Sequence, residues 1–150
     1  FQVQTEAYVP AMVEPLELFR RRLQTAPASA WVAETADGVQ AYLMAYPSVL
    51  GKIAALGQDF EIANTADALY LHDLAVGSRL AGKGVAVQLV NAALATARQS
   101  GFKYSCLVSV QNTQAFWQKQ GYVVYAAANP EQRQHLQTYS GPASYLYQVL

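Results

Sequence analysis

The fold of this chain is decided by a short loop, Arg79-Leu80-Ala81-Gly82-Lys83-Gly84, and by the segments on either side of it. Before the loop, the apolar run Ala68–Val76 is typical of a buried strand, which Gly77 and Ser78 end. After the loop, apolar residues recur at the spacing of a helix that packs against a core, at Ala86, Leu89, Val90, Ala93, Leu94 and Ala97. Gly101 ends that helix, so the loop joins a buried strand to a core-facing helix.

A glycine-containing loop in this position can bind phosphate groups. Its glycines let the backbone approach a bulky anion, and the free N–H groups and dipole of the following helix favour negative charge. A simple tight turn is the alternative, with about equal weight. Two familiar phosphate loops fit poorly, because a dinucleotide loop needs a small residue in place of Val87. A P-loop, suggested by the spacing from Gly77 to Lys83, needs Ser or Thr in place of Gly84.

The rest of the chain alternates between predicted strands and helices. An amphipathic helix begins near Pro15 and ends before Ala26-Pro27. A hairpin follows, in which residues 31–34 and 39–46 flank a turn at Asp37-Gly38, and residues 47–67 form a long surface loop. The remaining pattern is strand, short helix, strand and closing strand, over residues 102–110, 113–120, 122–127 and 144–150. This alternation predicts an α/β fold, and 150 residues suit a single domain.

Composition excludes several function classes. Ten Lys and Arg residues balance ten Asp and Glu residues, so no overall field draws the chain to nucleic acid or an anionic membrane. No apolar run approaches the ~20 residues of a membrane span. The single cysteine, Cys106, is expected in the core and indicates a reducing, cytoplasmic setting. Cys106 and the two histidines do not form a set of metal ligands. Both His135 and the run Arg20-Arg21-Arg22 are expected to be solvated.

The loop resembles the pyrophosphate-binding signature of the GNAT superfamily, the acyl-CoA-dependent N-acyltransferases. That signature is Gln or Arg, two residues, Gly, one residue, then Gly or Ala, which Arg79, Gly82 and Gly84 match. Residues 70–76 look like the family's preceding strand, and residues 112–122 resemble its downstream motif of Asn, Ala and an aromatic pair. The early hairpin and the closing strand also agree, so the resemblance covers most of the chain and implies that the family's first strand lies upstream.

The resemblance implies a mixed, mostly antiparallel central sheet flanked by helices. In it, the strand ending at Val76 splays from the strand 103–110 and opens a wedge for the pantetheine arm of acetyl-CoA. In this fold, backbone groups of the strand that ends at Val76 pair with that arm, and loop N–H groups bind the pyrophosphate. The aromatic pair lies near the sulfur. The implied cofactor-binding residues are Leu74, Ala75, Val76, Arg79, Leu80, Ala81, Gly82, Lys83, Gly84, Val85, Asn112, Phe116 and Trp117.

Catalysis by direct attack of an amine on the thioester needs a base. Strand alternation predicts that Tyr70, His72 and Leu74 share one face, with Asp73 on the other in a structural role. His72 is the best candidate, because imidazole titrates near neutrality and the family places histidines at the positions that match Tyr70 and His72. A hydrogen-bonded core histidine is the alternative.

The proton donor departs from the family pattern. Many members have Tyr where this chain has Trp117, and an indole cannot act as a general acid. The alternatives are a hydrogen bond from the Trp117 ring N–H, direct protonation of the thiolate by water, or Tyr70 or Tyr125 as the donor. Strand spacing places most of the other tyrosines in the core or the cleft lining, and Tyr42, Tyr46 and Tyr139 are candidates for an acceptor pocket.

These features predict an N-acetyltransferase that moves an acetyl group from acetyl-CoA to a primary amine. A small molecule is the expected acceptor, a protein amino group is compatible, and the resemblance allows a homodimer. The alternative is a non-catalytic acyl-CoA-binding module on the same fold, which the presence of Trp117 favours. A P-loop nucleotide hydrolase is the weakest reading.

Overall fold

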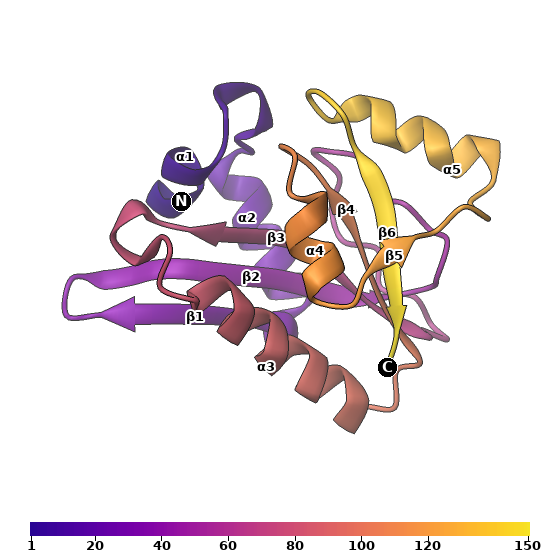
Figure 1. The fold of residues 1–150 in the computed structure, drawn as a ribbon, viewed down its shortest axis with the longest axis horizontal. Helices are drawn as coiled ribbons and strands as arrows, with labels where there is room; N and C mark the ends of the chain where they lie inside the picture. Colours follow the sequence, from indigo (N-terminus) through magenta and orange to yellow (C-terminus); the bar gives the residue numbers. More distant parts are fainter.

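The computed structural model describes residues 1–150 as a six-stranded sheet with helices on both faces (Figure 1). The strands lie in the order β1-β2-β3-β4-β6-β5, and every neighbouring pair is antiparallel except β3 and β4. Their bounds are Ala30–Thr35 (β1), Gly38–Ser48 (β2), Ala68–Val76 (β3), Tyr104–Ser109 (β4), Val123–Val124 (β5) and Ser144–Val149 (β6). The predicted α/β class and mostly antiparallel sheet are confirmed.

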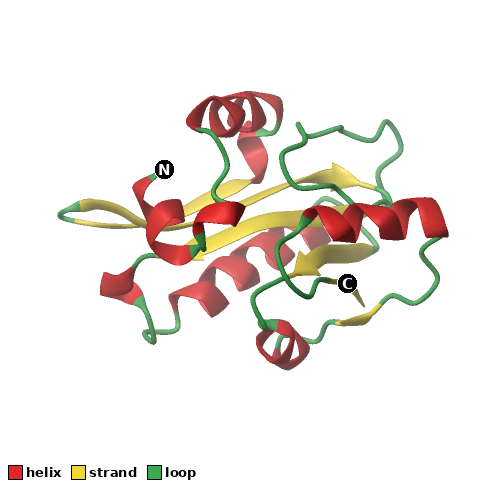
Figure 2. Cartoon of the chain, turned by 90° about the horizontal axis from the view of Figure 1, so that it is seen from above, coloured by secondary structure: helices red, strands yellow, loops and turns green.

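The helices divide between the two faces of the sheet (Figure 2). Helix α3 and the short α4 contribute to one buried cluster, which contains Leu43 and Leu71. Helices α1 and α2 pack against the other cluster, which contains Tyr42 and Tyr70. The helix bounds are Gln2–Ala7 (α1), Leu16–Thr25 (α2), Val85–Gln99 (α3), Gln114–Lys119 (α4) and Pro130–Gln134 (α5), with 3₁₀ turns at Pro10–Met12, Pro27–Ser29, Ser78–Leu80 and His135–Thr138.

The local signals explain most of these elements. Gly38 has a φ of +97° at the hairpin turn, a conformation that glycine adopts without the cost of a Cβ. Helix α2 begins directly after Pro15, and α3 ends at Gln99, two residues before Gly101. No helix has both the length and the apolar character needed to cross a membrane.

Several expectations were wrong in detail. The strand expected over residues 122–127 is reduced to Val123–Val124, and the polar segment 130–138 is helical. Helix α1 was not anticipated. Arg22, expected in a solvated run, is 1% exposed, because its guanidinium pairs with a buried carboxylate. His135, also expected to be solvated, is half-buried, and its Nδ1 lies 2.5 Å from the Ile53 carbonyl oxygen.

Strands β3 and β4 pair only over part of their length. The parallel register joins Ala68–Leu71 to residues 104–107 and goes no further, although β3 continues to Val76. Figure 1 shows the two strands diverging beyond this point. One edge of β3 after Leu71 therefore has no strand partner, as the expected wedge requires.

A bulge interrupts β3 at the same place. Its register with β2 pairs Asp73 with Met44 but Leu71 with Ala45, so His72 is an extra residue on the β3 side. The bulge shifts the alternation, and Asp73 then points to the same face as His72, where Tyr42 contacts it. The expectation that His72 shares a face with Leu74, and Asp73 lies opposite, was therefore wrong.

Candidate active site

A cavity of about 270 Å³ lies where β3 and β4 separate. Residues from both buried clusters line it, so it passes through the opening in the sheet. The lining residues at the opening are Leu71, His72, Asp73 and Leu74 from β3 and Val108 from β4. The cavity therefore has two sides, one toward α3 and α4 and the other toward α1 and α2.

The loop predicted to hold phosphate leads into α3. Gly82 and Gly84 have φ values of +72° and +76°, and a Cβ at either position would meet no atom within 4 Å. Backbone conformation, not space, therefore requires glycine at these two positions. The N–H groups of Gly82, Gly84 and Val85 to Val87 donate to no backbone carbonyl. They form a set of free donors at the start of a helix of 15 residues, an arrangement suited to an anion.

The two basic side chains of the loop lie in solvent. Arg79 forms an exposed ion pair with Asp37 in the hairpin turn, and Lys83 is exposed without an ion-pair partner. Backbone donors are thus the main feature of this loop.

The aromatic pair lies on the α4 side of the cavity. Both Phe116 and Trp117 line it, and Trp117 is buried against Tyr122 with ring centroids 5.4 Å apart. Asn112 is exposed and does not line the cavity, whereas its neighbour Gln111 does. Gln111 has a φ of +50°, and its buried side-chain nitrogen has no hydrogen-bond partner.

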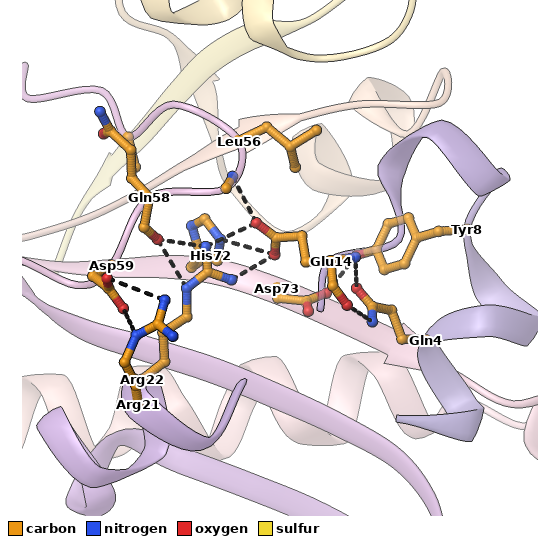
Figure 3. A network of polar contacts seen from close by, with 12 residues as sticks. Gln4, Tyr8, Glu14, Arg21, Arg22, Leu56, Gln58, Asp59, His72 and Asp73 are labelled. Carbon is orange, nitrogen blue, oxygen red and sulfur yellow. Dashed lines mark hydrogen bonds and ion pairs between the residues drawn. The ribbon is translucent and has the colours of Figure 1, made fainter. Parts of the chain in front are cut away.

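A buried ion pair forms the other side of the cavity (Figure 3). The Arg22 guanidinium contacts both carboxylate oxygens of Glu14, at 2.5 and 2.8 Å, and also donates to the Gln58 carbonyl. Glu14 Oε1 accepts a third bond from the Gly57 N–H at 2.8 Å. The Gln4 amide bonds the N–H and carbonyl of Glu14 at 2.8 and 3.0 Å, so both side chain and backbone of Glu14 are fixed.

His72 faces this ion pair. Its Nε2 lies 3.7 Å from Glu14 Oε2, and its Nδ1 is buried without any hydrogen-bond partner. The side chain is 3% exposed, with the Phe60 ring edge-on at 5.2 Å. Burial raises the pKa of Glu14, but the facing His72 and the Arg22 guanidinium outweigh it and lower that pKa to about 2. An ionised Glu14 favours a proton on Nε2, which leaves the Nδ1 lone pair free.

Asp73 is held by two tyrosines. Tyr8 donates to one carboxylate oxygen at 2.7 Å, and Tyr42 donates to the other at 2.8 Å. Burial raises the pKa of Asp73 above its ordinary value, although His72 and the two hydroxyl donors act in the opposite direction. The Tyr8 hydroxyl also lies 3.0 Å from the Leu74 carbonyl on the expected pantetheine-binding edge, so its single proton is shared between that oxygen and the closer Asp73 carboxylate.

Of the other proposed participants, all but Tyr139 lie outside the cavity lining. Tyr70 is 1% exposed, stacks on Tyr46 and accepts a bond from the Ala54 N–H at 3.3 Å. Tyr125 packs against Tyr145 and Tyr147, away from the opening. Of the tyrosines considered for an acceptor pocket, Tyr139 lines the cavity, and its hydroxyl donates to the Ala54 carbonyl at 2.7 Å. No group of His, Cys, Asp and Glu side chains has a metal-binding arrangement.

The sequence reasoning missed the acidic side of the site. Glu14, Arg22, Gln4, Tyr8 and Gln111 were not identified as site residues. One signal was present. Glu14 and Arg22 are about two helical turns apart, so both can lie on the apolar side of a helix that begins near Pro15. Nothing in the sequence placed them against His72.

Comparisons with known proteins agree with this geometry. Residues 2–122 match the model of the acetyltransferase (GNAT) family. The loading GNATL domain of CurA from Lyngbya majuscula superposes with a TM-score of 0.72 at 14% identity, covering 97% of this chain and 88% of that one. The GphF GNAT-like decarboxylase, solved with isobutyryl-CoA, gives 0.71 at 14% identity, covering 99% and 91%.

A third structure broadens the set of similar folds. Ard1 from Thermoplasma volcanium gives a TM-score of 0.60 at 18% identity, covering 97% of this chain and 82% of that one. A comparison with curated protein sequences gives no significant match. The family match supports acyl-CoA-dependent N-acyltransferase activity in general terms. This chain belongs to the acetyltransferase (GNAT) family.

Proposed function

We propose that this protein transfers an acetyl group from acetyl-CoA to a primary amine by direct attack, with both substrates bound at once. The observation that carries the proposal is the buried, unpartnered Nδ1 of His72 in a residue that lines a cavity between the divided strands. A buried polar atom without a partner is costly unless a ligand completes it. A small amine is the expected acceptor, and a protein amino group is compatible.

The acyl-CoA would bind on the α3 side. The groups we assign to it are the free N–H groups of Gly82, Gly84 and Val85 to Val87 for the pyrophosphate and the unpaired edge of β3 for the pantetheine arm. Such an edge offers backbone donors and acceptors to an extended ligand in the way that it would to another strand. Phe116 and Trp117 would then lie close to the thioester.

The amine would enter from the side of Glu14 and Asp73. Ionised Glu14 would hold the Nε2–H of His72, so that Nδ1 takes a proton from the incoming ammonium. The amine nitrogen then forms the new C–N bond as the C–S bond of the thioester breaks. The nitrogen then loses a second proton, which the departing thiolate accepts. The reaction therefore needs no acidic side chain at the position of Trp117.

Release of free CoA thiol from acetyl-CoA, measured with a panel of primary amines, tests this proposal. The wild-type protein should release thiol above the background rate in the presence of an amine. His72→Ala should lower kcat by about 100-fold or more, the usual loss for a general base. Stabilisation of the variant by CoA, followed as a shift in Tm, should persist.

The second histidine provides a matched control. His135 is bonded to the Ile53 carbonyl outside the cavity lining, so His135→Ala should keep a kcat near that of the wild-type protein. Equal losses in both variants would contradict the role of His72. Stabilisation by CoA without thiol release for any amine would instead favour the non-catalytic acyl-CoA-binding module.

A further inference from the structure

Carboxyl groups, and no cationic side chains, line the acceptor side of the cavity. The side chains there are Gln4, Tyr8, Met12, Glu14, Leu56 and Tyr139, with His72 and Asp73 at the junction with the opening. Two of these residues carry carboxyl groups, Glu14 and Asp73. No Lys or Arg side chain lines any part of the cavity.

The nearest guanidinium, that of Arg22, is already paired with Glu14 and is not available to a substrate anion. Arg22 is 1% exposed and lies behind Glu14, and each of its three nitrogens already has an acceptor in Glu14 or Gln58. The guanidinium also covers the Phe60 ring at 5.1 Å. A negatively charged substrate group would therefore meet carboxylates without a cation to pair with it, which is unfavourable in a buried site.

A positively charged amine meets the opposite conditions. The carboxylate of Glu14 attracts an ammonium group toward His72, whose unpartnered Nδ1 can accept one of its protons. Met12, Leu56 and the ring of Tyr139 offer apolar contact to the rest of the molecule. The enclosed space is small, because the cavity of about 270 Å³ must also hold the reacting thioester.

We infer that the acceptor is a small primary amine with an apolar body and no carboxylate or phosphate group, so that free amino acids are excluded. This inference rests on the proposed function and narrows its acceptor class. The carboxyl groups on the acceptor side of the cavity would repel anionic groups of an amine, in addition to attracting its ammonium group.

Three related amines test the selectivity. Phenethylamine, phenylalanine and phenylalaninamide share one side chain, but only phenylalanine carries a carboxylate. We expect kcat/KM for phenethylamine to exceed that for phenylalanine by about 100-fold, because like charges in a buried site repel strongly. Phenylalaninamide should lie closer to phenethylamine, which separates the effect of charge from that of bulk.

A substitution at Leu56 tests the same selectivity by changing the charge of the cavity in place of the charge of the substrate. Leu56 is half-buried, lines the cavity and lies in the long loop that follows β2. Leu56→Arg adds a cation that a substrate carboxylate can pair with, and should narrow the preference for phenethylamine over phenylalanine by about tenfold. Leu56→Gln, of comparable polarity without charge, should narrow it much less.

Binding measurements keep the inference distinguishable from the proposed activity. The shift in Tm caused by each amine in the presence of CoA should be large for phenethylamine and absent for phenylalanine. Equal turnover and equal stabilisation by the two amines would overturn the inference and leave the proposed activity standing. Absence of thiol release with every amine would overturn the proposed activity. The Tm shifts would then still show whether the cavity prefers amines without a carboxylate group.

Discussion

The two sides of the cavity are built in different ways. The α3 side combines lining residues from β3, the start of α3 and the segment 108–117, and the glycine loop before α3 adds free backbone N–H groups. The α2 side is formed by side chains from distant parts of the chain, including Glu14, His72 and Tyr139. Its polar groups are interdependent, because Glu14 touches Arg22, Gly57 and Gln4.

This difference has a physical consequence. A backbone cradle depends on local conformation, so its sensitive positions are those where φ is unusual. A buried charged cluster depends on every partner being present, because removal of one leaves another charge unpaired in a poor solvent. Substitutions on the α3 side should therefore act mainly on cofactor affinity, and substitutions on the α2 side on stability and acceptor chemistry.

The largest effect is expected at Arg22. Arg22→Met leaves the buried carboxylate of Glu14 without its cation and should lower the free energy of unfolding by about 3–5 kcal/mol. The neighbouring Arg21 pairs with Asp59 at the surface, with both side chains more than half exposed, and Arg21→Met should change stability far less. Denaturant unfolding of both variants checks this, and similar losses would contradict the importance of burial.

The glycine loop gives the next largest effect. Gly84→Ala introduces a side chain at a φ of +76° and should cost about 1–2 kcal/mol in stability. It should also raise KM for acetyl-CoA by about fivefold or more, because the displaced N–H groups no longer converge on the anion. Gly101→Ala provides the control, since Gly101 has a φ of +78° and open space around it at the other end of α3. An equal rise of KM in the control would show that lost stability alone is responsible.

A smaller effect distinguishes Gln111 from Asn112, in the turn after β4. The buried side-chain nitrogen of Gln111 lacks a partner beside the cavity, whereas Asn112 is exposed. Gln111→Leu should raise KM for acetyl-CoA about threefold to tenfold, the usual loss of one hydrogen bond. Asn112→Ala tests the expectation from the sequence that Asn112 binds the cofactor. A larger effect at Asn112 would mean that the loop rearranges when the cofactor binds.

A further comparison concerns the pH dependence of stability. The pKa of Glu14 is about 2 in the folded protein against an ordinary value of 4.5, so its contribution to stability is complete above pH 4.5. That contribution is lost as the pH falls from 4.5 towards 2. Glu14→Gln should flatten the decline in unfolding free energy over this range, relative to the wild-type protein.

A second carboxylate serves as the control for that measurement. Glu61 is exposed and paired with Lys52, so Glu61→Gln should leave the decline nearly unchanged. Asp73 has a raised pKa and acts in the opposite direction, and Glu14 makes only the smallest contribution to that pKa, so Glu14→Gln should change the effect of Asp73 only slightly. Parallel curves for the wild-type protein and Glu14→Gln would contradict the lowered pKa.

The same division explains what could be predicted from sequence. The strand Ala68–Val76, the loop glycines and α3 follow one another, so local patterns were sufficient to locate them. The contact between His72 and Glu14 joins residues that lie far apart in the sequence, so it depends on tertiary packing that no local pattern records. Arg22 is closer to Glu14 in the sequence, but the burial of that pair also depends on tertiary packing. Three adjacent arginines resemble a solvated face, yet one of them is buried.

The bulge at His72 shows the same limit on a smaller scale. Strict alternation assigned Asp73 to the face opposite His72, and one inserted residue reversed that assignment. The residue types of β3 give no sign of a bulge, since neither glycine nor proline interrupts the strand. The insertion is visible only in the register with β2.

The central claim is that the opening between β3 and β4 brings an acyl-CoA next to His72. A crystal structure of the protein with bound acetyl-CoA tests it most directly. The account predicts the pyrophosphate on the free N–H groups of Gly82, Gly84 and Val85 to Val87 and the thioester in the cavity, within one water molecule of His72 Nδ1. A cofactor bound elsewhere, or a thioester on the far side of Trp117 from His72, would contradict it.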